Sequence, residues 1–304
     1  MAEIPQKHLD DLIERGFTLV PDFLSSEELD SARSDVLRYF PPPRDLATTP
    51  HRYGSILEDP EHLQVEFPFD ADTINYNSAH PDIIHFVERL LGTTEILLSQ
   101  SAIWAKYAGT GKFEQTMHLD YEGNTLVVPR DDGVFRQVNF ILYYSDVTKD
   151  MGPTFVAPQD RTRGFGLWPP FRPKKQWPKL YKLEQPIIAK AGSVLIFSMR
   201  TYHRAGEITA EIGARFTQHL VYRSAQCPFN GYHQYSQFGE KPELKRFIEN
   251  ATPRQREMLG FPAPGHAYWI EETLNAVAIR YPKMDMKPYR ARKSMRSSTR
   301  RPRS

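Results

Sequence analysis

The stretch Met117-His118-Leu119-Asp120 decides how this 304-residue chain is interpreted. In a strand, residues i and i+2 project from the same face, so His118 and Asp120 can place an imidazole and a carboxylate side by side on the inner wall of a barrel. His203, more than eighty residues later, can complete the set from another strand. Two histidines and one carboxylate on one face hold Fe(II) and leave adjacent coordination positions open.

A basic residue follows the distal histidine within a second β-rich stretch. Arg215 lies twelve residues after His203, inside the segment 214–222, which is predicted to be a strand. Its planar guanidinium can bind a carboxylate at two points. His219 lies on the same predicted strand with its side chain on the same face, so it is an alternative distal metal ligand.

The order of these motifs resembles the phytanoyl-CoA dioxygenase family of iron- and 2-oxoglutarate-dependent oxygenases. That order is His-x-Asp, a long insert, a histidine, and an arginine about a dozen residues later. Three further segments carry the resemblance, which extends from about residue 15 to 225. They are Lys106-Tyr107-Ala108-Gly109, Gly152-Pro153-Thr154-Phe155-Val156-Ala157-Pro158 and Ala191-Gly192-Ser193-Val194-Leu195-Ile196-Phe197.

The resemblance implies a fold and a set of site residues. The fold is mostly β, a double-stranded β-helix (jelly-roll, cupin-like) barrel with flanking N-terminal and C-terminal helices. His118, Asp120 and His203 would be the catalytic metal ligands, with Fe(II) as cofactor and 2-oxoglutarate as cosubstrate. The resemblance places the distal histidine before the arginine, which favours His203 over His219.

Two basic residues are candidates for binding the cosubstrate. Arg215 would pair with the far carboxylate of 2-oxoglutarate. Lys106 has two interpretations, because a lysine in this region of the family contacts a cosubstrate carboxylate, whereas a lysine at a strand end is often simply exposed.

The implied activity is that of a 2-oxoglutarate-dependent dioxygenase. Dioxygen and 2-oxoglutarate would be consumed, succinate and carbon dioxide released, and an unactivated C–H bond of a small or lipid-like molecule hydroxylated. Asp120 favours hydroxylation or a related oxidation, since related halogenases have a small residue at that position. The alternatives are a protein or peptide hydroxylase of the same superfamily and a non-catalytic barrel that binds a ligand.

The chain departs from the family pattern at two places. A glycine and a small hydroxyl residue often follow the distal histidine, but here the sequence is His203-Arg204-Ala205-Gly206. One hydrogen bond to the cosubstrate is therefore absent or replaced. The Ser-His that often ends the Gly-Pro segment is also changed, to Ala157-Pro158-Gln159-Asp160, which leaves the role of that loop open.

Length and composition predict one domain followed by a tail. A chain with 40% hydrophobic residues can bury one large core. We expect a single oxygenase domain over residues 1–286, with the barrel core at about 93–225 and a helical C-terminal extension at about 240–286. Residues 287–304 hold eight Lys or Arg and no acid, so this basic tail is expected to be disordered.

The charge distribution and cysteine usage bear on partners and compartment. The formal net charge of +2 comes from the tail, and the remainder is mildly acidic, which argues against nucleic acid as a partner. A single cysteine, Cys227, excludes an internal disulfide and favours a reducing compartment. No apolar run approaches the roughly 18 residues of a membrane span, and the N-terminus lacks a signal-peptide pattern. We expect a cytoplasmic protein, whose C-terminal extension covers the barrel or forms a homodimer contact.

Local signals predict the elements around the barrel. Ile4–Arg15 should be a helix that ends at Gly16, before a strand over Phe17–Val20. Ser25 and Glu28 form a capping-box pattern for the next helix. A further helix is expected from Pro81 to Leu91.

Three regions carry open alternatives. Val134 to Val147 is expected to be a long strand, but both of its faces are apolar, so the face that points inward is undecided. Residues 160–182 are too long for a plain connection and form either a lid over substrate or a decoration outside the barrel. Asn124 and Arg130 are candidates for contacting substrate.

Overall fold

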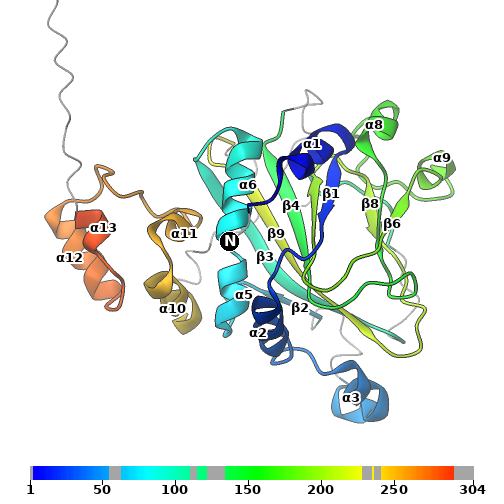
Figure 1. The fold of residues 1–304 in the computed structure, drawn as a ribbon, viewed down its shortest axis with the longest axis horizontal. Coiled ribbons are helices and arrows are strands. Elements are labelled where there is room, and N and C mark those ends of the chain that lie inside the picture. Colours follow the sequence, from blue (N-terminus) through cyan, green and yellow to red (C-terminus); the bar gives the residue numbers. More distant parts are fainter. Residues whose placement is uncertain are drawn as a thin grey trace, which may run out of the picture.

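The computed structural model describes residues 3–54, 63–109, 115–121, 134–227, 235 and 241–290, and it places two β-sheets at the centre of the molecule (Figure 1). The strands are β1 (Phe17–Val20), β2 (Gln64–Glu66), β3 (Ile96–Tyr107), β4 (Gln137–Tyr143), β5 (Thr154–Val156), β6 (Gln185–Ile187), β7 (Val194–Ser198), β8 (His203–Ala205) and β9 (Ala214–Ser224). The longer helices are α1 (Gln6–Arg15), α2 (Ser26–Val36), α6 (Pro81–Leu91), α10 (Pro242–Asn250) and α12 (Glu271–Arg280). The shorter ones are α3 (Pro43–Thr48), η1 (Pro50–Arg52), α5 (Asp72–Asn77), α8 (Gln159–Thr162), η3 (Arg163–Phe165), α9 (Pro178–Tyr181), α11 (Pro253–Glu257) and α13 (Lys287–Arg290).

Both sheets are antiparallel. The large sheet has six strands in the order β1-β7-β4-β9-β3-β2, and the small sheet has three in the order β6-β5-β8. Strands β3 and β9 pair over almost their whole length, with one register shift between Leu98 and Gln100.

Strand β4 shows which face of the large sheet points toward the small sheet. Phe140 and Leu142 belong to the core that the sheet shares with the helices, whereas Ile141 and Tyr143 belong to the core between the two sheets. Asn139 lies on the same side as Ile141, because side chains alternate along a strand. All seven residues of β4 are buried, which explains why the sequence showed no alternation of polar and apolar residues.

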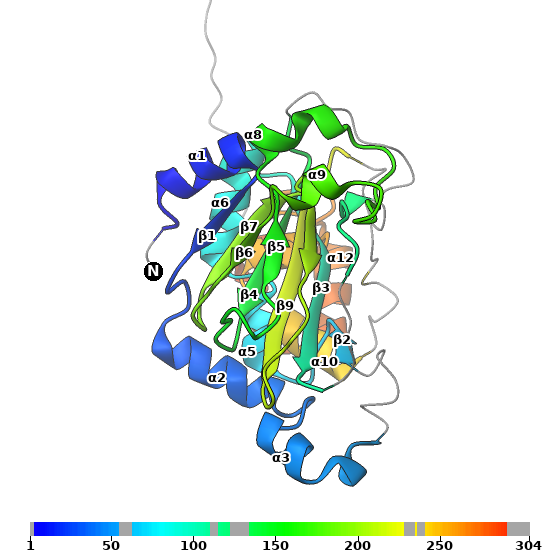
Figure 2. The same cartoon turned by 90° about the vertical axis from the view of Figure 1, so that its right-hand side faces the viewer.

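Helices cover the opposite face of the large sheet. Helices α5 and α6 lie against this face, and the C-terminal helices α10 to α13 lie beyond them (Figures 1 and 2). Phe86 of α6 meets Phe140 of β4 edge-on, with ring centroids 6.2 Å apart. Arg254 of α11 forms an ion pair of 2.6 Å with Glu88 of α6. The C-terminal helices therefore pack on the helical layer and not on the small sheet.

The first helix begins at Gln6, two residues after the predicted start at Ile4, and the other helix ends predicted near the N-terminus agree with the structure. Helix α1 ends at Arg15, and Gly16 adopts a left-handed conformation with a φ of 80°, which a residue with a side chain rarely adopts. Ser25 and Glu28 form the predicted capping box at the start of α2. His80 and Gly92 cap the two ends of α6.

The proportions of helix and strand differ from the prediction. The sheet-rich core is present, but the helices of the described residues contain more residues than the strands do, so the chain is a mixed fold. Helices α10, α11 and α12 lie where the C-terminal extension was expected. Order continues into the segment expected to be a disordered tail, because Lys287–Arg290 forms α13 and Tyr289 is buried. Residues 291–304 lie outside the described part.

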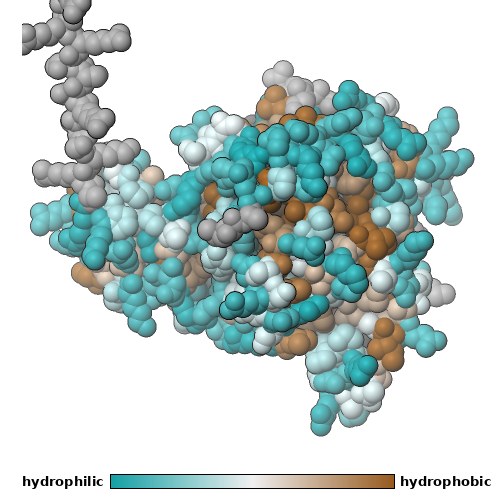
Figure 3. All heavy atoms as spheres, viewed as in Figure 1, coloured by the Kyte–Doolittle hydropathy of each residue, from teal (hydrophilic) through white to brown (hydrophobic). Residues whose placement is uncertain are grey.

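The surface agrees with this layered arrangement. In the view of Figure 3 most of the surface is hydrophilic, and hydrophobic residues gather where the edges of the two sheets approach each other, near β1 and β8. None of the helices in the described residues has both the length and the apolar character needed to cross a membrane.

A buried polar network joins the large sheet to the helical layer. Asn77 donates a hydrogen bond to the hydroxyl of Tyr144 at 3.0 Å, and that hydroxyl donates to Gln218. The amide of Gln218 donates to the hydroxyls of Ser78 and Ser101, at 2.9 and 3.1 Å. Buried polar groups destabilise the fold when their partners are removed, so the network fixes how α5 sits on the sheet.

Removal of one hydroxyl tests this network. Tyr144→Phe should lower the free energy of unfolding by about 1–3 kcal/mol, because Gln218 and Asn77 each lose a buried partner. Urea denaturation should show a lower midpoint with an unchanged slope. Tyr268→Phe, at a 43% exposed position, is the control and should leave the midpoint unchanged. An equal effect of both substitutions would contradict the assigned role.

Candidate functional site

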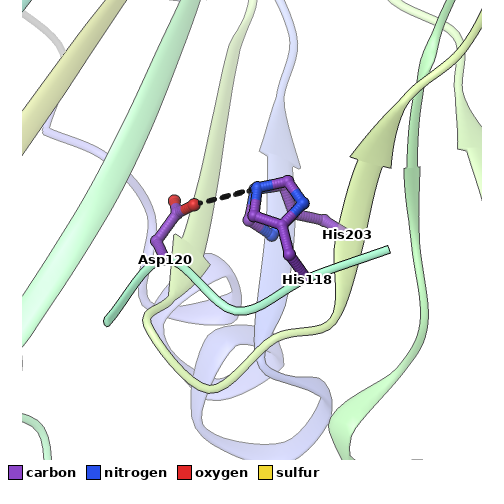
Figure 4. A group of neighbouring side chains, drawn as sticks. All are labelled: His118, Asp120 and His203. Carbon is purple, nitrogen blue, oxygen red and sulfur yellow. Dashed lines mark ion pairs between the residues drawn. The ribbon is translucent and has the colours of Figure 1, made fainter. Parts of the chain in front are cut away.

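Three side chains converge on one point between the two sheets. One oxygen of Asp120 lies 3.3 Å from Nε2 of His118 and 3.2 Å from Nε2 of His203. The possible ligand atoms of the three residues all lie within 4.8 Å of one another. Figure 4 shows the two imidazoles lying together and the carboxylate pointing toward them. The structure thus brings together the three residues that the sequence predicted as metal ligands.

The two histidines are held together by their own backbones. The amide of His118 donates to the carbonyl of His203 at 2.9 Å, and the amide of His203 donates back at 3.1 Å. Residues paired in this way carry their side chains on the same face of a sheet, and the two ring centroids are 4.4 Å apart. His203 also pairs with Val156, so His118 continues the small sheet beyond β8.

Main-chain carbonyls determine which nitrogen of each ring carries hydrogen in the neutral form. Nδ1 of His118 lies 2.9 Å from the carbonyl of Thr116, and Nδ1 of His203 lies 3.0 Å from the carbonyl of Thr201. A carbonyl can only accept, so each Nδ1 must carry the hydrogen, and in a neutral ring Nε2 then carries a lone pair. Both lone pairs face Asp120. This arrangement orients histidine as a metal ligand.

The carboxylate is oriented from the large sheet. The side-chain amide of Asn139, on the inner face of β4, donates to Oδ2 of Asp120 at 2.6 Å and leaves Oδ1 directed at the histidines. Burial opposes ionisation of Asp120, but the imidazoles of His203 and His118 hold the pKa of that carboxyl well below its usual range. Burial lowers the pKa of His203, and the Asp120 carboxylate outweighs this effect and raises it.

This donor set fits a divalent cation. Two imidazole nitrogens and one carboxylate oxygen are suitable ligands for Fe(II), and three protein ligands leave positions for small molecules. The side chain of Asp120 remains 26% exposed, compared with 11% for His118 and 9% for His203. An incoming ligand would therefore approach from the side of the carboxylate.

Two cations lie directly opposite each other on neighbouring strands of the large sheet. Lys106 of β3 and Arg215 of β9 are cross-strand partners. Arg215 donates to the carbonyl of Gly152, and Lys106 donates to the carbonyl of Gly206 at 2.6 Å. Like charges at such positions destabilise a sheet. Burial and the charge of Arg215 lower the pKa of Lys106 to about 8. A ligand with a carboxylate would relieve this repulsion.

The loops beside these cations approach each other closely. Gly152 has a φ of +61°, and a Cβ added there would lie 2.8 Å from the carbonyl oxygen of Gly206. A Cβ on Gly206 would meet Phe155 and the carbonyl of Pro153, each at 2.8 Å. The Gly-Pro segment noted in the sequence therefore lies beside Arg215, where only glycine allows the two loops to meet.

His219, the alternative distal ligand, lies outside the group of three. Its Nε2 lies 3.2 Å from the hydroxyl of Thr217, and its ring lies 5.7 Å from that of Trp104. Burial and the charge of Arg215 lower its pKa to about 3, so the ring is neutral at physiological pH.

The segment 160–182 mainly packs against the parts of the chain that carry the three candidate ligands. Part of it packs in a core with Met117, Leu119 and Tyr202, whose side chains belong to the segments that carry the ligands. The amide of Arg172 donates to the carbonyl of Met117 at 2.8 Å. Phe171 is different, since its ring stacks on His118 with centroids 5.9 Å apart. The segment therefore packs against the strands that carry the candidate ligands and also places one ring, that of Phe171, beside His118.

Several contacts of the site were not anticipated. The roles of Asn139 and of the carbonyls of Thr116 and Thr201 depend on strand pairing that no local pattern reveals. Arg204, noted as a departure from the family pattern, forms a two-point ion pair with Glu184, with both distances at 2.7 Å. It is therefore held by a structural contact. The substrate-contact candidates Asn124 and Arg130 lie outside the described residues.

Comparison with solved structures shows the fold. The epimerase SnoN from nogalamycin biosynthesis, in complex with Fe3+, alpha ketoglutarate and nogalamycin RO, has a TM-score of 0.51 at 16% identity, over 72% of this chain and 83% of that chain. The alpha ketoglutarate dependent carbocyclase SnoK has a TM-score of 0.52 at 17% identity, over 73% and 85%. HygX from Streptomyces hygroscopicus, with nickel and 2-oxoglutarate bound, has a TM-score of 0.52 at 13% identity, over 73% and 88%.

Sequence comparison identifies the family. A search of curated proteins gave no significant match. The family model of phytanoyl-CoA dioxygenase matches residues 12–216, close to the range over which the motifs suggested a resemblance. The matched range contains His118, Asp120, His203 and Arg215. The chain belongs to the phytanoyl-CoA dioxygenase family.

Proposed function

We propose that this protein is an Fe(II)- and 2-oxoglutarate-dependent dioxygenase that hydroxylates an unactivated C–H bond of a small or lipid-like molecule. The observation that carries the proposal is the convergence of His118, Asp120 and His203, whose possible ligand atoms lie within 4.8 Å of one another. Family membership and the fold shared with SnoK and HygX support it.

The residues of the site have separate tasks in this proposal. His118 and His203 present lone pairs at Nε2, and Asp120 contributes the negative charge that partly balances a divalent ion. Iron and 2-oxoglutarate, when bound, supply the oxidation with dioxygen that the side chains alone lack. Asn139 holds the carboxylate in one orientation, so that the same oxygen faces both histidines.

The cation pair, Lys106 and Arg215, is the proposed binding site of the cosubstrate. The guanidinium of Arg215 can bind the far carboxylate of 2-oxoglutarate, and Lys106 adds a second positive charge from the adjacent strand. Both cations already bond to main-chain carbonyls, which holds them in place before the ligand arrives. Substrate specificity is then left to the remaining walls of the site.

The wider organisation forms part of the same proposal. The two antiparallel sheets would be the halves of a jelly-roll barrel, within a single oxygenase domain over residues 1–286 that works in the cytoplasm. The helical extension, which packs beyond α6, is the proposed homodimer contact.

The alternative functions are other reactions, or binding alone, at the same site. SnoN is described as an epimerase and SnoK as a carbocyclase, so related folds carry reactions other than hydroxylation. A peptide hydroxylase or a barrel that only binds a ligand would keep the three ligands as well. Product analysis separates these possibilities, because only a hydroxylase adds oxygen to a small molecule while forming succinate.

The first test compares two histidines. His118→Ala should weaken Fe(II) binding by more than the roughly 10- to 100-fold expected when a ligand loses a supporting partner. It should also reduce succinate formation from 2-oxoglutarate to background. His219→Ala, the matched control, should leave Fe(II) affinity within about three-fold, because His219 lies outside the group of three. Anaerobic titration calorimetry measures binding. Similar losses in both variants would refute the assigned ligands.

The second test removes the residue that orients the carboxylate. Asn139→Ala should lower Fe(II) affinity by about 10- to 100-fold, because Asp120 loses its partner at Oδ2. Asn250→Ala, at an exposed position in α10, is the control and should not alter binding. Unchanged affinity in the Asn139 variant would show that packing alone orients the carboxylate.

The third test concerns the cation pair. Arg215→Met should raise the KM for 2-oxoglutarate by about 10- to 100-fold, because charge-assisted hydrogen bonds are lost, and Lys106→Met should raise it less. In the wild type this KM should also rise as the pH increases through about 8, since Lys106 then loses its proton. The rise should be absent in Lys106→Met. A rise of the same size in that variant would assign the titration to another group.

A further inference from the structure

Two large aromatic side chains remain partly exposed next to the rings of the site. Phe171 is 47% exposed and Trp104 is 36% exposed. Each lies against an imidazole, Phe171 against His118 at 5.9 Å and Trp104 against His219 at 5.7 Å. Single exposed apolar residues need no explanation, but two aromatic residues that each lie beside an imidazole between the sheets are typical of a ligand-binding surface.

The exposure of Phe171 does not come from a loosely held loop. Both of its neighbours bond to the segment that carries the metal ligands. The carbonyl of Pro170 accepts from the amide of Leu119 at 3.2 Å, and the amide of Arg172 donates to the carbonyl of Met117 at 2.8 Å. Arg172 itself is fully buried. The backbone therefore fixes Phe171 beside His118 while the residue remains 47% exposed.

Trp104 is fixed in a similar way. It lies inside strand β3, paired with Thr217 on one side and with Gln64 on the other. Its side chain shares a face with Lys106, two residues along the strand. His219, which it contacts, lies near enough to Asp120 and His203 for their charges to act on its pKa. Trp104 is thus part of the wall that leads from the cation pair to the three ligands.

We propose that the substrate carries a flat aromatic ring system that stacks on Phe171 and Trp104. This inference rests on the proposed function, because it concerns the substrate of the same site. The ring of Phe171 is tilted by only 21° from the imidazole of His118, so the two rings are nearly parallel while Phe171 remains 47% exposed. A planar substrate stacked against Phe171 would lie next to the ring of one of the three candidate ligands. An aliphatic chain would gain nothing from the ring geometry.

The test uses a ring probe, 2-naphthol, and a chain probe of comparable apolar area, 1-decanol. Binding to the full-length protein is followed by ligand-observed NMR with Zn(II) or paramagnetic Co(II) added. In the wild type, Co(II) but not Zn(II) should enhance relaxation of the naphthol protons. Phe171→Ala and Trp104→Ala should each weaken naphthol binding by about two- to ten-fold, the range expected for one aromatic contact. Phe171→Leu keeps the volume without the ring and should behave like Phe171→Ala.

Controls separate this inference from the proposed function. Tyr268→Ala removes a 43% exposed ring from the C-terminal extension and should not change naphthol binding. Failure of Co(II) to bind would refute the metal site, and hence the proposed function. Metal binding with unchanged naphthol affinity in Phe171→Leu and Trp104→Ala would overturn only the aromatic site. The aromatic site would also be overturned if decanol bound as tightly as naphthol and responded equally to both substitutions. Failure of naphthol to bind would overturn it as well.

Discussion

The reciprocal backbone hydrogen bonds between His118 and His203 are the constraint on which the site depends. They join two segments more than eighty residues apart in the chain and place both imidazoles on one face. The carbonyls two residues earlier, of Thr116 and Thr201, then set the same orientation in both rings. One strand-pairing event therefore positions two of the proposed metal ligands and determines which nitrogen of each is available.

The third ligand makes the site depend on both sheets. Asp120 follows the His118 segment, which extends the small sheet, but its carboxylate is oriented by Asn139 on the inner face of the large sheet. A shift of one sheet against the other would move the carboxylate relative to the histidines. The core between the sheets, which contains Ile141 and Leu195, therefore maintains the geometry of the site as well as the stability of the fold. Binding of a metal ion would in turn favour the packed arrangement of the sheets.

The features of this structure that depend on local sequence patterns could be predicted from the sequence. The left-handed Gly16, the capping box at Ser25 and the His-x-Asp motif depend on neighbours within a few residues. Asn139 could not be assigned because β4 is buried on both faces, so its inner side leaves no trace in hydropathy. The positions of Phe171 and Lys106 depend on contacts across the sheets, which only the tertiary structure provides.

Charged and aromatic side chains occupy different positions on the inner face of strands β3 and β9. Lys106 and Arg215 bring two cations to the inner face of β3 and β9, and Trp104 occupies the same face two residues earlier in the chain. His219 lies on the same face, beyond Trp104 and Thr217 when counted from the cation pair, and it stays neutral because burial and the charge of Arg215 lower its pKa to about 3. A charged ring there would add a third cation and strengthen the hold on any anion. Because the imidazole is neutral, it adds no positive charge beside Trp104, so the proposed cosubstrate and the proposed aromatic ring would occupy adjoining places without competing.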